Sequence, residues 1–380
     1  MYRKYKPSQL FTGTQMLNNH VLLCKPDGSI EAIVKEEDAG DQVQILDGIL
    51  CPGFVNAHCH IELSHLKALI PIHTGLPKFI EHVMSIRHQH NVEEKLGALQ
   101  AAQQELFESG TVAVGDICNT TDSIAIKKNS PLYWHNFIEL TGFVDTAAQS
   151  RLAAGEAILQ HFEQELSKYP FNCSLVPHAP YSVSKNLFEL LNQNTAGKII
   201  SIHNQETPAE DKLFKNKSGD FLAMYQHLGI DISGFNATGK SSLQSWLPYF
   251  GHQQKIISVH NSFTSQADID FAGQQLLYCL CPNANLYIEN VLPPIELLIK
   301  NNCPIVLGTD SYASNLQLNM MAEINTIQKH FPQIAIETIL QWATINGAKA
   351  LGIDDRFGNF EKGKNPGMVL IKDGVAKRIA

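Results

Sequence analysis

The sequence predicts an α/β protein: a (β/α)8 (TIM) barrel with a small accessory β domain formed by both chain termini. Buried-looking strands alternate with amphipathic helical stretches through the middle of the chain, and eight such strands can be counted, the number that closes a barrel. Both ends instead show short strands separated by glycine turns. With 380 residues and 44% hydrophobic content, the chain is long enough to bury both cores.

The two ends of the chain are expected to form the accessory domain together. In VLLCKPDGSIEAIV, the Pro-Asp-Gly sequence at 26–28 stands between two apolar runs, which is typical of a β-hairpin turn. The closing segment GNFEKGKNPGMVLIKDG shows the same pattern of short strands separated by glycine turns. We therefore predict accessory β structure at 1–52 and 354–380, and the barrel at 53–353.

The middle of the chain alternates between strands and helices, as parallel βα units do. Helical stretches at 92–109, 151–166 and 336–351 carry apolar residues at spacings of three and four, and Gly110 and Gly352 end the first and the last. The predicted strands are 53–58, 111–117, 133–140, 172–177, 198–203, 255–260, 277–281 and 304–308.

Composition and charge exclude several classes of protein. The net charge of −8 and the absence of a basic block argue against nucleic-acid binding and favour a small-molecule substrate. The N-terminal sequence lacks the apolar core of a secretion signal, and no apolar stretch approaches the roughly 20 residues that cross a bilayer. Eight cysteines without the spacing of a small disulfide scaffold predict reduced thiols. We expect a soluble cytoplasmic protein with no membrane partner.

His58 and His60 end the first predicted barrel strand. Side chains two apart on a strand share a face, so both imidazoles can reach one ion. A His-x-His pair is frequent by chance, and a single histidine is more often satisfied by local hydrogen bonds. More polar groups follow other strands, at the end where a barrel places its active site. They are His178, His203, His260 and Asp310.

Imidazole and carboxylate ligands suit zinc or another borderline first-row ion, and they leave a coordination position for water. Such an ion lowers the pKa of its water to about 7 and supplies hydroxide at neutral pH. We predict one divalent ion, with Zn²⁺ as the first candidate and Fe²⁺ or Mn²⁺ as alternatives.

Several motifs together resemble the amidohydrolase superfamily, in its branch of aromatic-amine deaminases and chlorohydrolases. The resemblance covers nearly the whole chain, including the closing segment 358–369. It implies that His58, His60, His203 and Asp310 are the metal ligands. The motifs are PGFVNAHCH at 52–60, PHAPYS at 177–182, HNQE at 203–206, VHN at 259–261, CPNAN at 281–285 and GTDS at 308–311.

The resemblance also implies that Glu206 is the proton shuttle and that His260 orients the attacking water. Glu206 would protonate a ring nitrogen and then the departing ammonia, while Asp310 would accept the proton of the water. Relatives with two metals carry a carboxylated lysine on the fourth strand. This chain has His178 there, so we predict a single ion, with His178 as a substrate-binding donor.

The activity implied is hydrolytic deamination of an aminated purine or a purine-nucleoside-like substrate, with metal-bound hydroxide attacking the amino-bearing carbon. The string HCHIELSH, with Thr74-Gly75-Leu76 downstream, resembles 6-aminodeoxyfutalosine deaminases of the alternative menaquinone pathway. The alternatives are a chlorohydrolase or cyclic amidase of an N-heterocycle that uses the same site and, from another class, a non-catalytic metal-binding scaffold. Glu206 favours the deaminase, because displacement of ammonia requires protons. Relatives are commonly dimers, so a homodimer is the oligomeric expectation.

Three further groups are weaker candidates for substrate contacts. Glu62 follows the histidine pair on its loop, and Ser311 and Asn315 follow Asp310. Solvated loop residues are an equal alternative for Glu62. The segment 75–87 is either a helical flap over the site or a packing helix of the barrel.

The string GFNATGKS at 234–241 satisfies the pattern of a phosphate-binding loop. That loop requires a strand running into it and a helix leaving it. Here a short piece after a helix precedes the motif, so we predict no nucleotide site. Ser241 or Ser242 is instead expected to cap the helix that follows.

Overall fold

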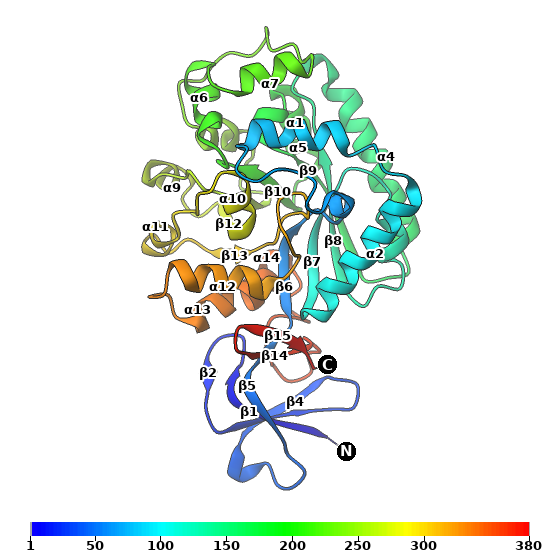
Figure 1. Cartoon of the computed structure of the whole chain (residues 1–380), viewed down its shortest axis with the longest axis vertical. Helices are drawn as coiled ribbons and strands as arrows, with labels where there is room; N and C mark the ends of the chain where they lie inside the picture. Colours follow the sequence, from blue (N-terminus) through cyan, green and yellow to red (C-terminus); the bar gives the residue numbers. More distant parts are fainter. Residues whose placement is uncertain (1, 380) are drawn as a thin grey trace.

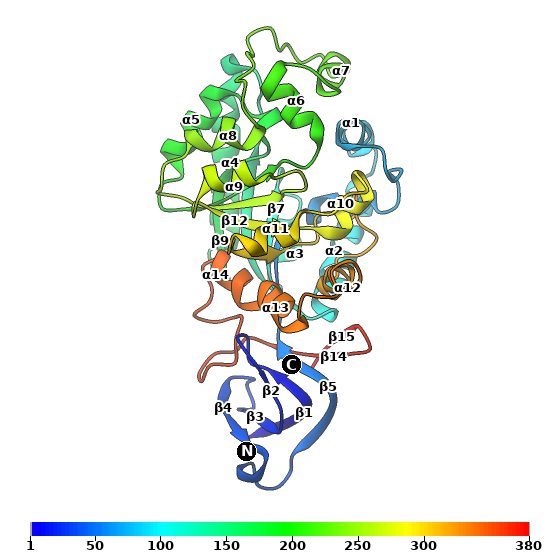
Figure 2. The same ribbon diagram turned by 90° about the vertical axis from the view of Figure 1, so that its left-hand side faces the viewer.

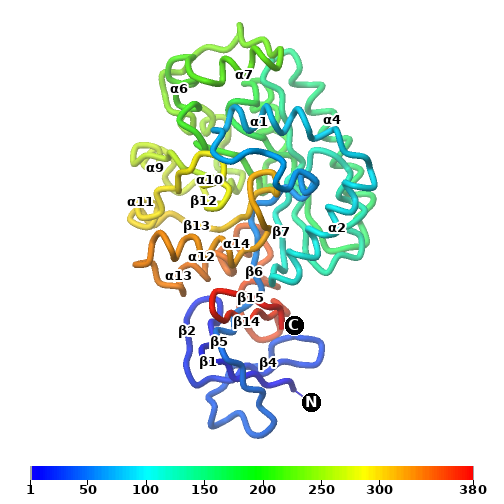
Figure 3. The backbone as a smooth tube through the Cα atoms, in the orientation of Figure 1, coloured from blue at the N-terminus to red at the C-terminus, as the bar shows by residue number. Residues whose placement is uncertain are grey.

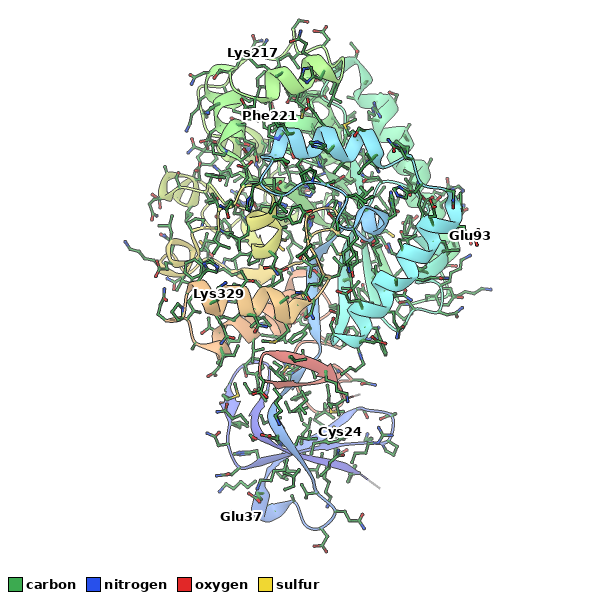
Figure 4. All side chains as sticks on the ribbon, viewed as in Figure 1. Cys24, Glu37, Glu93, Lys217, Phe221 and Lys329 are labelled. Atoms are coloured by element: carbon green, nitrogen blue, oxygen red, sulfur yellow. The ribbon has the colours of Figure 1, made fainter. Side chains whose placement is uncertain are left out.

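The computed structural model describes residues 2–379. The molecule is elongated: a β-sheet built from both ends of the chain lies at one end, and the barrel-like α/β body lies at the other (Figure 1). The view from the side shows the same separation (Figure 2). Cys24 lies in the terminal sheet, and Lys217 and Phe221 lie at the opposite end of the molecule (Figure 4).

The terminal sheet has seven strands in the order β15-β14-β5-β1-β3-β4, with β2 paired to β1. The predicted hairpin is present, and Gly28 in its turn has a φ of 88°. β14 pairs antiparallel with β5, so the chain's last segment returns to its first, as the red and blue tubes show (Figure 3). The strands are β1 (Arg3–Phe11), β2 (Met16–Leu17), β3 (His20–Cys24), β4 (Ile30–Lys35), β5 (Gln44–Pro52), β14 (Met368–Lys372) and β15 (Val375–Arg378).

Eight parallel strands form the centre of the body, and each lies within one or two residues of its predicted position. They pair as two four-stranded sheets, β6-β7-β8-β9 and β10-β11-β12-β13. The strands are β6 (Phe54–Cys59), β7 (Thr111–Cys118), β8 (Tyr133–Leu140), β9 (Phe171–Pro177), β10 (Ile199–Asn204), β11 (Lys255–His260), β12 (Leu276–Leu280) and β13 (Ile305–Leu307).

The two half-barrels meet at two seams that carry few backbone hydrogen bonds. At one seam, Cys59 and Asp310 form an isolated parallel bridge, and the N–H groups of Thr309 and Asp310 both donate to His58 O, at 3.0 and 3.1 Å. At the other, His203 N donates to His178 O at 2.9 Å. The fold is of the predicted barrel type, but continuous ladders join its strands only within each half.

Helices connect the strands, and glycine ends several of them. Gly110, at a φ of 97°, follows α2, and a Cβ there would meet Val369 of the terminal sheet at 2.4 Å. The helices of four or more residues are α1 (Leu76–Ile86), α2 (Val92–Glu108), α3 (Ile124–Lys127), α4 (Ala148–Leu166), α5 (Lys185–Asn194), α6 (Pro208–Asn216), α7 (Phe221–His227), α8 (Ser242–Trp246), α9 (Gln266–Ala272), α10 (Pro282–Ile288), α11 (Ile295–Lys300), α12 (Met320–His330), α13 (Ile336–Gln341), α14 (Gly347–Ala350) and the 3₁₀ helix η2 (Ile61–Leu66).

The last predicted helix differs from the expectation of one continuous α-helix over 336–351. α13 passes into a π-helical turn, Trp342–Asn346, before α14. Thr344 lies in that turn, and its hydroxyl donates back to Leu340 O at 2.6 Å. Competition of a side-chain hydroxyl for the helical carbonyls is one way in which a regular helix is disturbed.

The segment predicted as flap or packing helix forms α1, which contacts α7. Leu76, Phe79 and Val83 of α1 belong to an apolar cluster with Phe221 and Tyr225 of α7, separate from the main core. Both alternatives for this segment, flap and packing helix, stay predictions. Among the described residues, no helix combines the length and apolar character needed to cross a membrane. All eight cysteines are free, and seven are buried.

Candidate metal centre and active site

Side chains from both half-barrels converge at the carboxyl ends of the strands. His58, His203, His260 and Asp310 each offer a ligand atom, and these atoms all lie within 4.8 Å of one another. His60 joins them: its Nε2 lies 3.1 Å from Nε2 of His58 and of His203 and 3.4 Å from Asp310 Oδ1. The structure thus brings together all five residues that the sequence analysis placed in the centre, and all five are buried.

The donor set fits a divalent ion. Three imidazole nitrogens about 3 Å apart beside a carboxylate cannot all satisfy one another as donors, because a neutral imidazole has one N–H. Ligands of a tetrahedral ion with bonds near 2.1 Å lie about 3.4 Å from one another, close to the 3.1 Å between these nitrogens and the 3.4 Å from His58 and His60 to Asp310 Oδ1. Burial lowers the pKa of His58, His60 and His203, which keeps them neutral, the form that binds metal.

The backbone at the strand ends is unusual where these residues stand. Gln205, His260, Asn261 and Asp310 have φ between 47° and 72°, the left-handed region that non-glycine residues seldom adopt. Such strain persists only where surrounding contacts determine it, and it is concentrated at functional sites. Here these residues stand at the ends of β10, β11 and β13.

Hydrogen bonds fix which ring nitrogen faces the centre. His203 Nδ1 donates to His178 O at 2.8 Å, which leaves the Nε2 lone pair toward His60. Asn285 Nδ2 donates to His260 Nδ1 at 3.1 Å, so the proton of this imidazole is on Nε2. Ser314 Oγ donates to Asp310 Oδ2, while Oδ1 of that carboxylate faces the histidines.

Glu206 lies beside the centre, with Oε1 3.6 Å from His260 Nε2. It is 3% exposed. Burial, together with the charges of Asp310 and Glu210, raises the pKa of Glu206 well above its usual range. A raised pKa favours the protonated form of the carboxyl group, the form that can donate a proton to a bound ligand.

Glu210 holds the backbone that carries Glu206, and the sequence analysis did not identify it. Its carboxylate accepts from the N–H groups of Gln205 at 3.0 Å and Glu206 at 2.7 Å, and Ser242 Oγ donates to it at 2.8 Å. A carboxylate four residues after Glu206, in the first turn of a helix, was the signal available.

The segment with the phosphate-loop pattern, 234–241, leads into the helix whose first residue contacts Glu210. Residues 228–240 form turns and coil, so no strand runs into the motif, and Lys240 is exposed. Ser241 is the N-cap of α8, where its hydroxyl accepts from Gln244 N at 3.2 Å. Together with the bond from Ser242 to Glu210, this ties the segment to the support of the site.

Glu62 does not face the centre with a free carboxylate, contrary to its expected substrate contact. It is buried, and its oxygens accept from Asn119 N and Thr120 N, both at 3.0 Å, and from Ser123 Oγ at 3.1 Å. Its hydrogen-bonding capacity is used to hold the segment after β7. We therefore do not carry Glu62 into the proposed site.

The other predicted substrate contacts lie next to the centre. His178 is half-buried, its Nδ1 lies 2.6 Å from Ser182 Oγ, and its ring centroid lies 4.8 Å from that of His203. Ser311 Oγ lies 3.1 Å from Ser314 Oγ. Asn315 Nδ2 donates to Thr309 O and to Glu323, at 2.9 and 2.8 Å. Substrate binding by these three residues stays a prediction.

Comparison with protein families gives one matching model, the amidohydrolase family, over residues 49–379. Among curated proteins, a 5′-deoxyadenosine deaminase of Methanococcus maripaludis (strain C7) is 26% identical over 357 residues, which cover 88% of this chain and 78% of that protein.

Two solved structures show the same fold. The aminofutalosine deaminase of Helicobacter pylori, in complex with methylthio-coformycin, has a TM-score of 0.83 and 23% identity, covering 97% of this chain and 91% of that one. An adenosine deaminase from Xanthomonas campestris with bound zinc has a TM-score of 0.73 and 21% identity, covering 97% and 84%.

Proposed function

The chain belongs to the amidohydrolase family, and from this premise we propose that it is a metal-dependent deaminase of an adenosine-like compound. The observation that carries the proposal is the position of Glu206, a buried carboxyl group 3.6 Å from His260 and next to a cluster of neutral imidazoles and one carboxylate. That pairing supplies a cation site and a proton donor together, which hydrolytic loss of ammonia requires.

The proposed metal ligands are His58, His60, His203 and Asp310. His260 is left outside this set because its Nδ1 is engaged by Asn285 and its Nε2–H lies toward Glu206. When bound, the ion would lower the pKa of a water molecule and so provide the nucleophile at neutral pH. Zinc is the first candidate, since the donors are three nitrogens and one oxygen and a neighbouring fold contains it.

The residues around the ion would handle the protons. Glu206 would protonate the ring nitrogen next to the amino-bearing carbon, which makes that carbon more electrophilic. Nε2–H of His260 would donate a hydrogen bond to the attacking oxygen and orient it. Asp310 Oδ1 would take up the proton lost from that oxygen, and the proton would go on to the leaving ammonia.

The substrate class follows from the relatives. The curated relative acts on 5′-deoxyadenosine and the solved neighbours on aminofutalosine and adenosine. We propose 6-aminodeoxyfutalosine as the first compound to test, supported by the likeness of fold to an aminofutalosine deaminase. The buried free cysteines favour a reducing compartment such as the cytoplasm as the place of the reaction.

The proposal is tested by incubating zinc-loaded protein with adenosine, 5′-deoxyadenosine and 6-aminodeoxyfutalosine and measuring ammonia together with the ultraviolet spectrum of the base. We expect stoichiometric ammonia from at least one of them. Glu206→Gln should lower kcat by about 10²- to 10⁴-fold and leave the zinc content per chain unchanged. Inertness of the zinc-loaded protein toward every aminated purine, or full activity of Glu206→Gln, would contradict the proposal.

A further inference from the structure

A second carboxylate, from the first half-barrel, lies beside the site. Glu139, on β8, has a side chain that is only 4% exposed. Its Oε2 accepts from Asn119 Nδ2 at 2.8 Å. Its Oε1 is buried and has no hydrogen-bond partner among the residues that the structure describes. An ionisable oxygen left unpaired in this way is costly, so it calls for a partner that the chain itself does not supply.

The surroundings show where that partner would be. Glu139 Oε1 lies 3.6 Å from His203 Nδ1, but His203 already donates from this nitrogen to His178 O at 2.8 Å. His203 therefore does not donate a hydrogen bond to Glu139 Oε1. Ligand atoms of Glu139, His178 and His203 lie within 4.8 Å of one another. The carboxylate of Glu139 thus lies close to His203 and to the half-buried His178.

We propose that Glu139 is a specificity-determining residue whose Oε1 accepts a hydrogen bond from a sugar hydroxyl of the substrate. The inference rests on the proposed function and adds which part of the substrate Glu139 recognises. An adenine ring offers acceptors at N1, N3 and N7, and its one donor group is the amino group that leaves. A carboxylate acceptor is therefore matched by a hydroxyl of the attached sugar rather than by the base.

Two other roles for Glu139 give different results and can be separated. If the carboxylate served to orient His203, its loss would lower the metal content. If it were only hydrated, its loss would not alter the preference between substrates. Recognition of a hydroxyl predicts instead that the effect of Glu139 and the effect of the hydroxyl depend on each other.

The test compares adenosine, 2′-deoxyadenosine and 3′-deoxyadenosine in wild type, Glu139→Ala and Glu139→Gln. For wild type, removal of the recognised hydroxyl should lower kcat/KM at least tenfold, the size expected for a hydrogen bond to a charged group. In Glu139→Ala the same two compounds should differ by less than about twofold, at an unchanged zinc content. Glu139→Gln retains an acceptor oxygen, so it should give an intermediate ratio and serves if the alanine variant does not fold.

The matched control is Glu62→Gln, since Glu62 is also a buried carboxylate but all its hydrogen bonds come from the protein. In Glu62→Gln, the ratio of kcat/KM between the compounds with and without the hydroxyl should equal the ratio in wild type. The inference is overturned if wild type shows no hydroxyl preference, if both Glu139 variants keep it, or if they lose zinc. Inertness of wild type toward these three compounds and also toward 5′-deoxyadenosine and 6-aminodeoxyfutalosine would instead overturn the proposed function, and the inference with it.

Discussion

At the scale of single residues, the site depends on buried carboxylates with different partners. Asp310 faces imidazoles, Glu206 lies beside a histidine and near other carboxylates, and Glu210 accepts from two backbone N–H groups and one hydroxyl. Each environment favours a different protonation state, and such differences are how one fold holds both an acid and a base at the same pH.

Glu210 gives a prediction about stability and pH. Burial raises the pKa of Glu210 to about 7. An ordinary glutamate in the unfolded chain has a pKa near 4.3, so the folded state binds the extra proton. The stabilisation by this group is therefore complete below about pH 4.3 and is lost as the pH rises through 7, by up to roughly 4 kcal/mol.

The check is urea unfolding of wild type and Glu210→Gln at several pH values between 4.5 and 8. The variant keeps one acceptor oxygen but loses the titration of the carboxyl group. Other buried carboxylates titrate in both proteins, so the difference between the two curves is the quantity to read. We expect wild type to lose its advantage as the pH rises; parallel curves would show that Glu210 does not titrate in this range.

What the sequence predicted at this scale depended on repetition and spacing. His58 and His60 are two apart on a strand, and the other histidines and Asp310 each lie at or just after the end of a strand. Their positions relative to the predicted strands therefore identified them. No such position in the sequence identified Glu139 as a site residue. The alternation of β8 directs His135, Phe137 and Glu139 to one face, but which face is inward follows only from the pairing of β8 with its neighbours.

At the scale of elements, the strands were predicted closely because each is a short apolar run bounded by polar or turn residues. The π-helical turn between α13 and α14 was not predicted, since one hydroxyl inside an otherwise helical pattern does not reveal it. The division into two ladders was not predicted either. Strand number favours a closed barrel, whereas the hydrogen bonds at each seam depend on the local register of strands far apart in sequence.

The seam between β13 and β6 gives a prediction about close packing. A Cβ added at Gly308 would lie 2.8 Å from His58 Cβ and from His58 O. Gly308→Ala should push β13 away from β6, separate Asp310 from His58, and lower stability by about 1–3 kcal/mol. Because two proposed ligands move apart, zinc content and kcat/KM should fall by more than tenfold.

Gly347→Ala is the matched control for that change. A Cβ there would lie 2.9 Å from Val55 Cβ, so it presses on β6 as well, but near the opposite end of the strand. We expect a similar loss in thermal unfolding temperature with zinc retained. Equal loss of zinc in both variants would show that β6 transmits strain along its length and that the seam is not special.

At the scale of the whole molecule, the proposed ligands join the two half-barrels. His58 and His60 come from the first sheet, and His203 and Asp310 come from the second. Backbone hydrogen bonds between the halves are few, so a shared ion adds a connection where the ladders are interrupted. The division of the chain at residues 52 and 353 stays a prediction, although the terminal sheet pairs strands from both ends.

Removal of the ion should therefore lower the stability of the whole body. A ligand present at about 1,000 times its dissociation constant stabilises the folded state by about 4 kcal/mol. Calorimetry of zinc-loaded and chelator-treated protein should show a lower unfolding temperature after treatment, restored by added zinc. His203→Gln should show a smaller difference between the two conditions. An unfolding temperature that does not respond to zinc would contradict a connecting role.

The seams also set an order of events during synthesis. The first histidine pair leaves the ribosome with β6, while the last proposed ligand follows β13, after most of the body has been made. The third imidazole, that of His203, follows with β10, so the set of proposed ligands is complete only near the end of translation. The site could then become active only late, when the second half-barrel packs against the first.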